Sequence, residues 1–467
     1  MLFNTLQFLF FFVVVSLSYF QLPHRWRWLL LLLASCYFYM AFVPIYILIL
    51  GATIVVDYFA GILIEKTSGH KRKLFLLMSL IANLGVLAVF KYYNFLNDIL
   101  TEILGSFQHQ NPIPALKMLL PIGLSFHTFQ AISYTIEVYR NNQKAEKHFG
   151  IYALYVLFYP QLVAGPIERP QNLLHQFYAE HIFDYERFKS GLSLMLWGLF
   201  KKVVIADRLS MAVDVAFSDP VHQSGLSMLV AVFFYAFQIY CDFSGYSDMA
   251  IGAARILGFD LMLNFNSPYF SKSITEFWRR WHISLSSWFK DYVYIPLGGN
   301  QKGNSRWIFN LLLVFLLSGL WHGANYTFLI WGGIHGVLVI LDTFFRRKFS
   351  FASRLHSPFF DAFQVLFTFF IVMLAWIFFR ATSLDNALSI FKVMANFSIH
   401  DSISLALNSN ELSFSFFLIT FLLAKDRLIP VFQFGTNGGF WVFHIVLAFC
   451  CYLFGVFNLT QFIYFQF

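Results

Sequence analysis

The stretch LSGLWHGANYTFLIWGGIHG, from Leu317 to Gly336, places two histidines inside an otherwise apolar run that also holds five glycines and two tryptophans. Ionisable groups are costly in hydrocarbon, so a histidine there normally lines a cavity or pairs with another polar group. The glycines that flank His322, Gly319 and Gly323, allow close approach of the backbone. The stretch therefore predicts a tight bend beside a pocket, with His322 and the Trp321 ring at that bend.

The composition of the whole chain indicates a membrane protein. Of the 467 residues, 58% are hydrophobic and only 12% are charged, whereas soluble domains carry roughly 25% charged residues. This excludes an ordinary soluble fold and predicts an all-α polytopic membrane protein. The net charge of +8 lies in short loops, which favours contact with anionic lipid and not with nucleic acid. The four cysteines lie in apolar surroundings without metal-type spacing, so we expect them to be structural.

Thirteen apolar segments are candidates for membrane crossings, and we expect roughly 10–12 of them to cross and some short ones to be re-entrant. The segments are 1–22, 28–43, 45–64, 74–95, 119–139, 149–165, 191–206, 227–246, 307–320, 326–345, 359–379, 412–423 and 439–457.

Basic clusters predict the orientation of the chain in the membrane. No Lys or Arg precedes the first apolar run, so we do not expect a signal peptide. The clusters at His24–Arg27, His70–Lys73 and Arg140–His148 fall on the same side when the crossings are counted, and Asn97–Lys117 on the other side has few basic residues. The positive-inside rule then predicts cytoplasmic loops at the three clusters and an N-terminus outside.

The centre of the chain, Tyr240–Asn304, breaks the membrane pattern with many charged and aromatic residues. The apolar residues of SITEFWRRWHISLSSWF (Ser273–Phe289) recur at spacings of three and four, which predicts one amphipathic helix lying in or dipping from the interface. Ser273 and Glu276 resemble a capping box at its start. The glycines of IPLGGN (Ile295–Asn300) predict a turn after it.

These motifs resemble the membrane-bound O-acyltransferase superfamily, and most closely its bacterial branch that acetylates exported polysaccharides. The matching segments are DFSGYSDMAIG (242–252), NFNSPYFSKSITEFWRRWHISLSSWFKDYVYIPLGGN (264–300), the opening stretch, QLVAGPIERP (161–170), FKKVVIADRL (200–209), WIFFRA (376–381) and FIYFQF (462–467). The resemblance implies a ring of transmembrane helices around a central catalytic funnel. It also implies one membrane domain over residues 1–467 with a catalytic core at about 120–345.

The same resemblance makes His322 the expected catalytic residue. A hydroxyl is a poor nucleophile at neutral pH, and a neutral imidazole can accept its proton as the new bond forms. The alternative is a packing histidine bonded to a backbone carbonyl. His282 is the second polar residue of the family pattern and would orient His322 or bind the acyl thioester, unless it is an interfacial anchor. His335 is a weaker candidate, since it can face another surface of the next helix.

Further polar residues are candidates for binding or structure. We expect Trp321, Asn325, Arg279, Arg280 and Lys290 to contact the substrate or donor, since guanidinium and ammonium groups suit phosphate oxygens. Glu168 and Arg169 are weaker candidates, and a solvated loop is the alternative for all these charges. Asp242, Asp248 and Arg255 are expected to form a buried ion-pair network in the core. The sequence has no HExxH or Cys/His cluster, so no metal site is expected.

The sequence therefore predicts an O-acetyltransferase of the bacterial inner membrane. Acetyl-CoA would be its donor substrate, no cofactor would be bound, and an extracytoplasmic acetyltransferase partner would pass the group to an alginate-type or peptidoglycan acceptor. Two alternatives stay open. One is an acetyl-group transporter, although no inverted repeat is visible. The other is a scaffold of a polysaccharide export complex without transferase chemistry.

Overall fold

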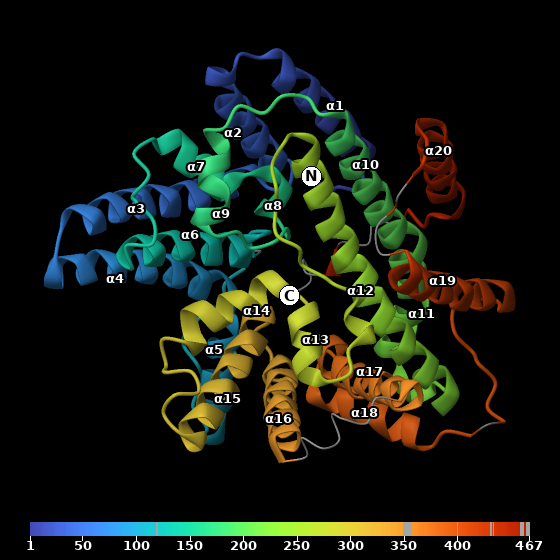
Figure 1. Ribbon diagram of the computed structural model, residues 1–467. Helices are drawn as coiled ribbons and strands as arrows, with labels where there is room; N and C mark the ends of the chain where they lie inside the picture. The colour runs from blue at the N-terminus through green and yellow to red at the C-terminus, as the bar shows by residue number, and fades with distance from the viewer. Residues whose placement is uncertain are drawn as a thin grey trace. The chain divides into compact units, whose positions relative to one another are not determined.

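The computed structural model describes residues 1–117, 120–348, 357–398, 400–429, 432, 434–457 and 462–463, and these residues form helices and no strands (Figure 1). This confirms the all-α class that the composition predicts. Two compact units can be distinguished. Unit 1 consists of residues 1–195 and 247–262, and unit 2 consists of residues 196–246 and the described part of 263–467.

Nine α-helices lie wholly within the described residues of unit 1. They are α1 (Leu6–Gln21), α2 (His24–Met40), α3 (Ile47–Lys66), α4 (Gly69–Leu87), α5 (Tyr93–Ser106), α6 (Leu124–Tyr139), α7 (Phe149–Leu157), α8 (Tyr159–Leu162) and α9 (Pro170–Leu173). The chain passes between the units within α10 (Tyr185–Phe200) and α12 (Gly225–Ile256).

The helices of unit 2 include the segments that carry the candidate histidines. They are α11 (Asp207–Ser218), α13 (Ile274–Arg280), α14 (Ile283–Phe289), α15 (Asn304–His322), α16 (Tyr326–Lys348), α17 (Pro358–Arg380), α18 (Leu384–Ala395), α19 (Ser409–Leu428) and α20 (Asn437–Phe454).

Seven helical segments in the described part of the chain are long and apolar enough to cross a membrane. They are Pro44–Lys66, Gly69–Ser106, Gly225–Ile256, Asn304–His322, Tyr326–Arg346, Pro358–Arg380 and Asn437–Phe454. Large apolar side chains on them face outward, as a lipid-facing surface requires; Phe359 is 84% exposed and Val442 64%. The chain is thus a multi-pass membrane protein. The expected 10–12 crossings stay a prediction, because shorter helices such as the apolar α1 are not among the seven.

Two of the three basic clusters begin helices instead of forming loops, which corrects the sequence-based boundaries. His24–Arg27 opens α2 and His70–Lys73 lies in the first turns of α4, so the connections shrink to Leu22–Pro23 and Thr67–Ser68. Long basic side chains can begin a helix near an interface because their charged heads reach water. Arg140–His148 lies between α6 and α7, as predicted.

The apolar segment Phe149–Gly165 is not one continuous helix, contrary to the expectation of a span. It breaks at Phe158 between α7 and the short α8. Pro160 lies in the first turn of α8, where the missing N–H costs nothing, whereas within a longer helix its ring would clash with the preceding turn. Leu119, the first residue of another expected span, lies outside the described residues.

The core of unit 2 is built from aromatic side chains. Trp281, Trp331 and Trp376 are at most 1% exposed. The rings of Trp281 and Trp376 lie 4.9 Å apart, and those of Trp331 and Trp376 lie 5.6 Å apart and nearly parallel. Such ring pairs add orientation-dependent stability to the burial of their area, so α13, α16 and α17 are held together around a defined aromatic centre.

Candidate active site

His322 is the last residue of α15, at the bend of a helical hairpin in which α15 and α16 pack along each other (Figure 1). A Cβ added to Gly319 or Gly332 would lie 2.2 or 2.3 Å from a carbonyl oxygen of the facing helix. At the bend, a Cβ on Gly323 would lie 2.1 Å from the Phe328 ring. Only glycine fits these three positions. The predicted tight bend is therefore confirmed, and it fixes where His322 lies.

Aromatic rings surround the imidazole of His322, which is 4% exposed. The ring centroids of Trp321, Trp331 and Phe379 lie 4.9, 5.1 and 5.0 Å from it, and all three meet it edge to face. These side chains come from α15, α16 and α17. A proton-transferring group in this position is shielded from bulk water, which strengthens its electrostatic interactions with a bound substrate.

His282 interrupts the amphipathic helix that the sequence predicts. Its φ of 43° and ψ of 55° lie in the left-handed region, so α13 ends at Arg280 and α14 begins at Ile283. The expectation of one helix over Ser273–Phe289 is therefore wrong. A positive φ is uncommon for a residue with a Cβ and persists only where surrounding contacts hold it. Helical periodicity could not reveal it, because the apolar spacing continues across the break.

The start of α13 follows the predicted pattern only in part. The Ser273 hydroxyl accepts the Glu276 N–H at 3.2 Å, which confirms the N-cap. The Glu276 carboxylate accepts the N–H of Lys272, one residue before the cap, at 2.9 Å. The backbone after α14 continues into a π-helical turn, Lys290–Tyr294, and the expected turn at Ile295–Asn300 follows it.

Hydrogen bonds around Asn264 determine which nitrogen of His282 carries the proton. The Asn264 side-chain oxygen accepts the N–H of Ser284 at 3.3 Å and its hydroxyl at 3.0 Å. It therefore also accepts from His282, whose Nδ1 lies 3.1 Å away. Since Nδ1 donates, Nε2 carries the lone pair. Burial lowers the pKa of His282 to about 3, so the ring is neutral and Nε2 can accept a hydrogen bond.

Trp321 links the surroundings of the two histidines. Its ring centroid lies 4.9 Å from that of His322 and 6.1 Å from that of His282. The His282 ring also packs against the ring of Phe243 of α12, with the two ring centroids 4.6 Å apart. Unit 2 therefore brings both predicted catalytic histidines and Trp321 into one buried aromatic cluster. Their chemical roles remain predictions.

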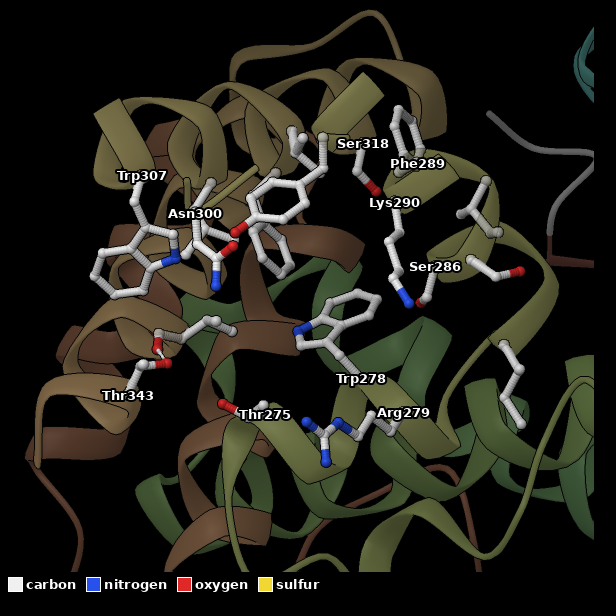
Figure 2. A pocket seen from close by; sticks show the side chains of 18 residues that line it. Thr275, Trp278, Arg279, Ser286, Phe289, Lys290, Asn300, Trp307, Ser318 and Thr343 are labelled. Carbon is white, nitrogen blue, oxygen red and sulfur yellow. Dashed lines mark hydrogen bonds between the residues drawn. The ribbon is translucent and has the colours of Figure 1, made fainter. Parts of the chain in front are cut away.

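A cavity of about 530 Å³ lies in unit 2 beside this cluster. Its lining is mostly apolar, but Arg279, Lys290 and Ser286 also line it, and Figure 2 shows Lys290 and Ser286 to the right of the Trp278 ring and Arg279 below it. Small-molecule sites typically have about 300–1,000 Å³, apolar walls and a few polar groups. Two of the predicted donor-binding residues, Arg279 and Lys290, therefore line a cavity of suitable size.

Two other predicted binding residues make contacts that belong to the fold. Arg280, next to Arg279, forms an ion pair with Glu276 at 2.7 Å. The Asn325 amide donates to the carbonyl of Thr382 at 3.0 Å, and its oxygen accepts the N–H of Thr327 at 3.0 Å. Asn325 thus caps the start of α16, a role for which Asn is well suited.

The expected core ion pair of Asp242 has a partner that the sequence analysis did not name. Lys202 lies 2.6 Å from Asp242 and 2.8 Å from Asp207, and all three are buried in unit 2. Asp242 also accepts the N–H of Ile463, in the part of FIYFQF that the structure describes, at 2.7 Å. Its other two expected partners, Asp248 and Arg255, lie in the part of α12 that belongs to unit 1.

In unit 1, Glu168 points inward. It is fully buried and accepts the N–H of Met262 at 2.5 Å. Burial raises its pKa to about 7. A buried acid that holds a loop backbone is poorly placed to steer a phosphate group. Arg169 is half-buried and donates to the carbonyl of Ile167 at 3.2 Å.

Sequence reasoning missed Asn264, Lys202 and the contact between Trp278 and His335. Asn264 and Lys202 lie within the quoted motifs, but no local spacing indicates their partners, which are 18 and 40 positions away (282 − 264 and 242 − 202). The Trp278 Nε1–H donates to His335 Nδ1 at 3.3 Å. A helix pattern shows which face a residue occupies, but it does not show which distant side chain meets it.

Comparison with known proteins finds a matching family and several similar proteins. Residues 100–384 match the model of the membrane-bound O-acyltransferase family, and both histidines lie in that range. The chain is 41% identical over 432 residues to a probable alginate O-acetylase of Azotobacter vinelandii, covering 91% of this chain and 83% of that protein. It is 38% identical over 432 residues to the peptidoglycan O-acetyltransferase of Helicobacter pylori, covering 84% and 80%. A teichoic acid D-alanyltransferase of Streptococcus thermophilus is 29% identical over 245 residues, covering 49% and 58%.

Proposed function

The chain belongs to the membrane-bound O-acyltransferase family and is an O-acyltransferase, and from that premise we propose that it transfers acetyl groups for the O-acetylation of an exported polysaccharide. The relatives that support this proposal are named for alginate and for peptidoglycan acetylation, and both cover more than four fifths of this chain. The acceptor is therefore an alginate-type polymer or peptidoglycan.

The observation that carries the proposal is the burial of His282 and His322 in one aromatic cluster within the residues that match the family. In this reaction the hydroxyl oxygen attacks the carbonyl carbon of the acyl thioester, the carbon–sulfur bond breaks and the donor leaves as its thiol, while the hydroxyl proton passes to a base. His322 is the base that accepts the proton. A positioned base of this kind contributes about 10²–10⁴-fold to the rate.

His282, whose ring also packs near Trp321, assists the reaction. Asn264 holds its proton on Nδ1, so Nε2 presents a lone pair. A neutral acceptor in that position can bind a hydroxyl or orient the reacting group without introducing a charge into the buried site. The tautomer is essential to this role, because an imidazole with its proton on Nε2 would donate instead.

The donor is a short acyl thioester, with acetyl-CoA as the proposed substrate, and the cavity beside the cluster receives it. Apolar walls suit the uncharged arm of such a donor, while Arg279 and Lys290 suit its phosphates. Trp321, placed between the two histidines, contacts the acyl group. These assignments are consistent with the cavity volume and with the charges that face it.

The protein acts in the bacterial inner membrane with its N-terminus outside and the three basic clusters in the cytoplasm. Residues 1–467 act as one membrane domain with a catalytic core at about 120–345, which overlaps the matched range. The acetyl group enters from the cytoplasmic side and leaves outward to an extracytoplasmic acetyltransferase partner. That partner then modifies the polymer.

The test is hydrolysis of acetyl-CoA by the purified protein in lipid nanodiscs, in which water takes the place of the acceptor hydroxyl. The wild type should release CoA, and His322→Ala should reduce this release by about 10²–10⁴-fold, because the proton acceptor is lost. His444→Ala is the matched control, since it truncates another buried imidazole, one that lies beyond both the proposed catalytic core and the matched range. Its turnover per folded molecule should be preserved.

Two outcomes would contradict the proposal. A wild type that folds but releases no CoA would exclude acetyl-CoA as the direct donor. Equal turnover in wild type and His322→Ala would exclude His322 as the base and would favour a transporter or a scaffold over an enzyme.

A further inference from the structure

The cavity ends about one helical turn away from His322. Phe315 and Ser318 of α15 line it, and His322 is the next residue on the same face of that helix, four positions after Ser318. Four residues rise about 6 Å along a helix axis. His322 itself does not line the cavity. A donor held in the cavity therefore has to extend by a short distance to reach the histidine.

Trp278 and Trp331 connect the cavity lining to His322 by contacts between their rings. Trp278 lines the cavity, and its ring centroid lies 5.7 Å from that of Trp331. The ring of Trp331 lies 5.1 Å from that of His322 and meets it edge to face. Figure 2 shows the Trp278 indole in the middle of the labelled lining residues. Two large rings therefore narrow the route from the donor to the base.

His335 holds the Trp278 ring in place. Its Nδ1 accepts the indole N–H at 3.3 Å, and the two rings are nearly perpendicular at 5.1 Å. The Phe277 ring stacks on the other side of the fully buried His335 at 6.3 Å, with an interplanar angle of 10°. Because His335 lies one turn after Trp331 on α16, one helix positions both tryptophans. His335 accepts through Nδ1, so its Nε2 carries the proton and the ring is neutral.

We propose that Trp278, oriented by His335, is the size filter between the donor cavity and His322, and that it restricts transfer to short acyl groups. This rests on the proposed function in one respect: the cavity must be the site of the thioester donor. Trp278 is then a specificity-determining residue and His335 is a positioning residue.

Tight packing around the acyl chain allows Trp278 to discriminate between acyl groups of different length. One additional methylene in a tight apolar site changes kcat/KM by about 10–200-fold. Butyryl donors carry two methylenes more than acetyl donors, so the wild type should discriminate strongly against them. A smaller side chain at position 278 should relax this selection, because the space it vacates admits the longer chain.

The first experiment measures kcat/KM in nanodiscs for acetyl-, propionyl- and butyryl-CoA. Trp278→Ala should raise the butyryl-to-acetyl ratio by at least about tenfold, the lower limit for one methylene, and Trp278→Phe should give an intermediate value. Trp307→Ala is the matched control, because Trp307 also lines the cavity but contacts Phe344 and lies on the far side in Figure 2. An unchanged ratio in Trp278→Ala, or an equal rise in Trp307→Ala, would overturn the proposal.

The second experiment tests His335 by the position of its acceptor atom. The oxygen of Asn lies near the place of Nδ1, whereas the oxygen of Gln lies near that of Nε2. His335→Asn should therefore keep the acyl-length selection, while His335→Gln and His335→Leu should relax it as Trp278→Phe does. A merely structural role would change stability and leave the ratio of donors unaltered. Equal ratios in the Asn, Gln and Leu variants would remove His335 from the filter.

The third experiment needs no acyl donor, so it separates this proposal from the proposed function. A His322→Cys variant, made with the four native cysteines replaced by alanine, is alkylated with iodoacetamide and with the bulkier N-benzylmaleimide. Adding Trp278→Ala should increase the rate of alkylation by N-benzylmaleimide much more than the rate of alkylation by iodoacetamide. If Trp278→Ala changes the alkylation rates of both reagents equally, Trp278 is not a size filter, even when the wild type turns over acetyl-CoA. Trp278→Ala could accelerate alkylation by the bulky reagent alone while the wild type does not turn over acetyl-CoA. That result would support Trp278 as a size filter and exclude acetyl-CoA as the donor.

Discussion

Replacing Gly332 by alanine should force the α15–α16 hairpin apart near His322. The new Cβ would lie 2.3 Å from the carbonyl oxygen of Phe315, whereas close carbon–oxygen contacts in proteins lie at about 3.3–3.6 Å. The two helices would therefore have to separate by roughly 1 Å, a distance worked from that contact. Overpacking of this kind costs about 1–3 kcal/mol. The gain from removing a helix glycine, about 0.5–1 kcal/mol, offsets only part of it.

Activity should fall more than stability in this variant. His322 lies on the facing helix, one turn beyond the Gly319 contact. A displacement of about 1 Å in a catalytic group can reduce the rate by about 10²-fold. Gly333→Ala provides the control within the same helix, because its Cβ would meet only the Leu316 side chain at an ordinary 3.7 Å. That variant should be as stable as the wild type or slightly more stable, with normal turnover.

The assay combines thermal unfolding in nanodiscs with CoA release per folded molecule. Gly332→Ala should unfold at a lower temperature than Gly333→Ala and turn over donor far more slowly. If the two adjacent variants behave alike in both measurements, the close contact of α15 and α16 does not position His322, and the geometric reasoning is wrong.

Three further predictions concern His282, pH and topology. His282→Ala should reduce turnover strongly because it removes the Nε2 acceptor, whereas His282→Gln should retain much of the rate because its oxygen lies near the place of Nε2. An Ala variant near the wild-type rate would make His282 an interfacial anchor. Because burial raises the pKa of Glu168 from 4.5 to about 7, the folded state binds that proton more tightly than the unfolded chain does. Its stabilising contribution is complete below about pH 4.5 and is lost as the pH rises through 7. Unfolding experiments between pH 5 and 8 should show this loss, and a Glu168→Gln variant that keeps it would refute the assignment. In intact cells, an impermeant maleimide should label a cysteine placed at Gln110 but not one placed at Lys71, and the reverse result would invert the topology.

Much of the fold could be predicted because it depends on local pattern. The fraction of apolar residues and the length of the apolar runs determine a helical membrane protein, since a backbone in lipid must satisfy its own hydrogen bonds. The N-cap at Ser273 and the bend at Gly323 could also be read locally, because each depends on one side chain or its absence. His322 could be singled out for the same reason, as an ionisable residue at a glycine-rich bend in an apolar run.

Contacts between distant residues could not be read in this way. Arg279 and Arg280 are neighbours with the same charge, yet one lines the cavity and the other pairs with Glu276. The surroundings of the two arginines differ because of the position of α13 among the other helices of unit 2. Lys202 was not predicted as the partner of Asp242, because ion pairs in a buried core depend on which helices meet.

The sequence by itself determined the class of the fold, the apolar spans and the histidine at the bend, since these follow from composition, period and local sterics. Only the tertiary structure decided that His282 adopts a left-handed conformation, that Asn264 sets its tautomer and that His335 holds Trp278. The physical reason is that a strained backbone angle or a buried hydrogen bond is maintained by groups brought from elsewhere in the chain. Local periodicity carries no information about those groups.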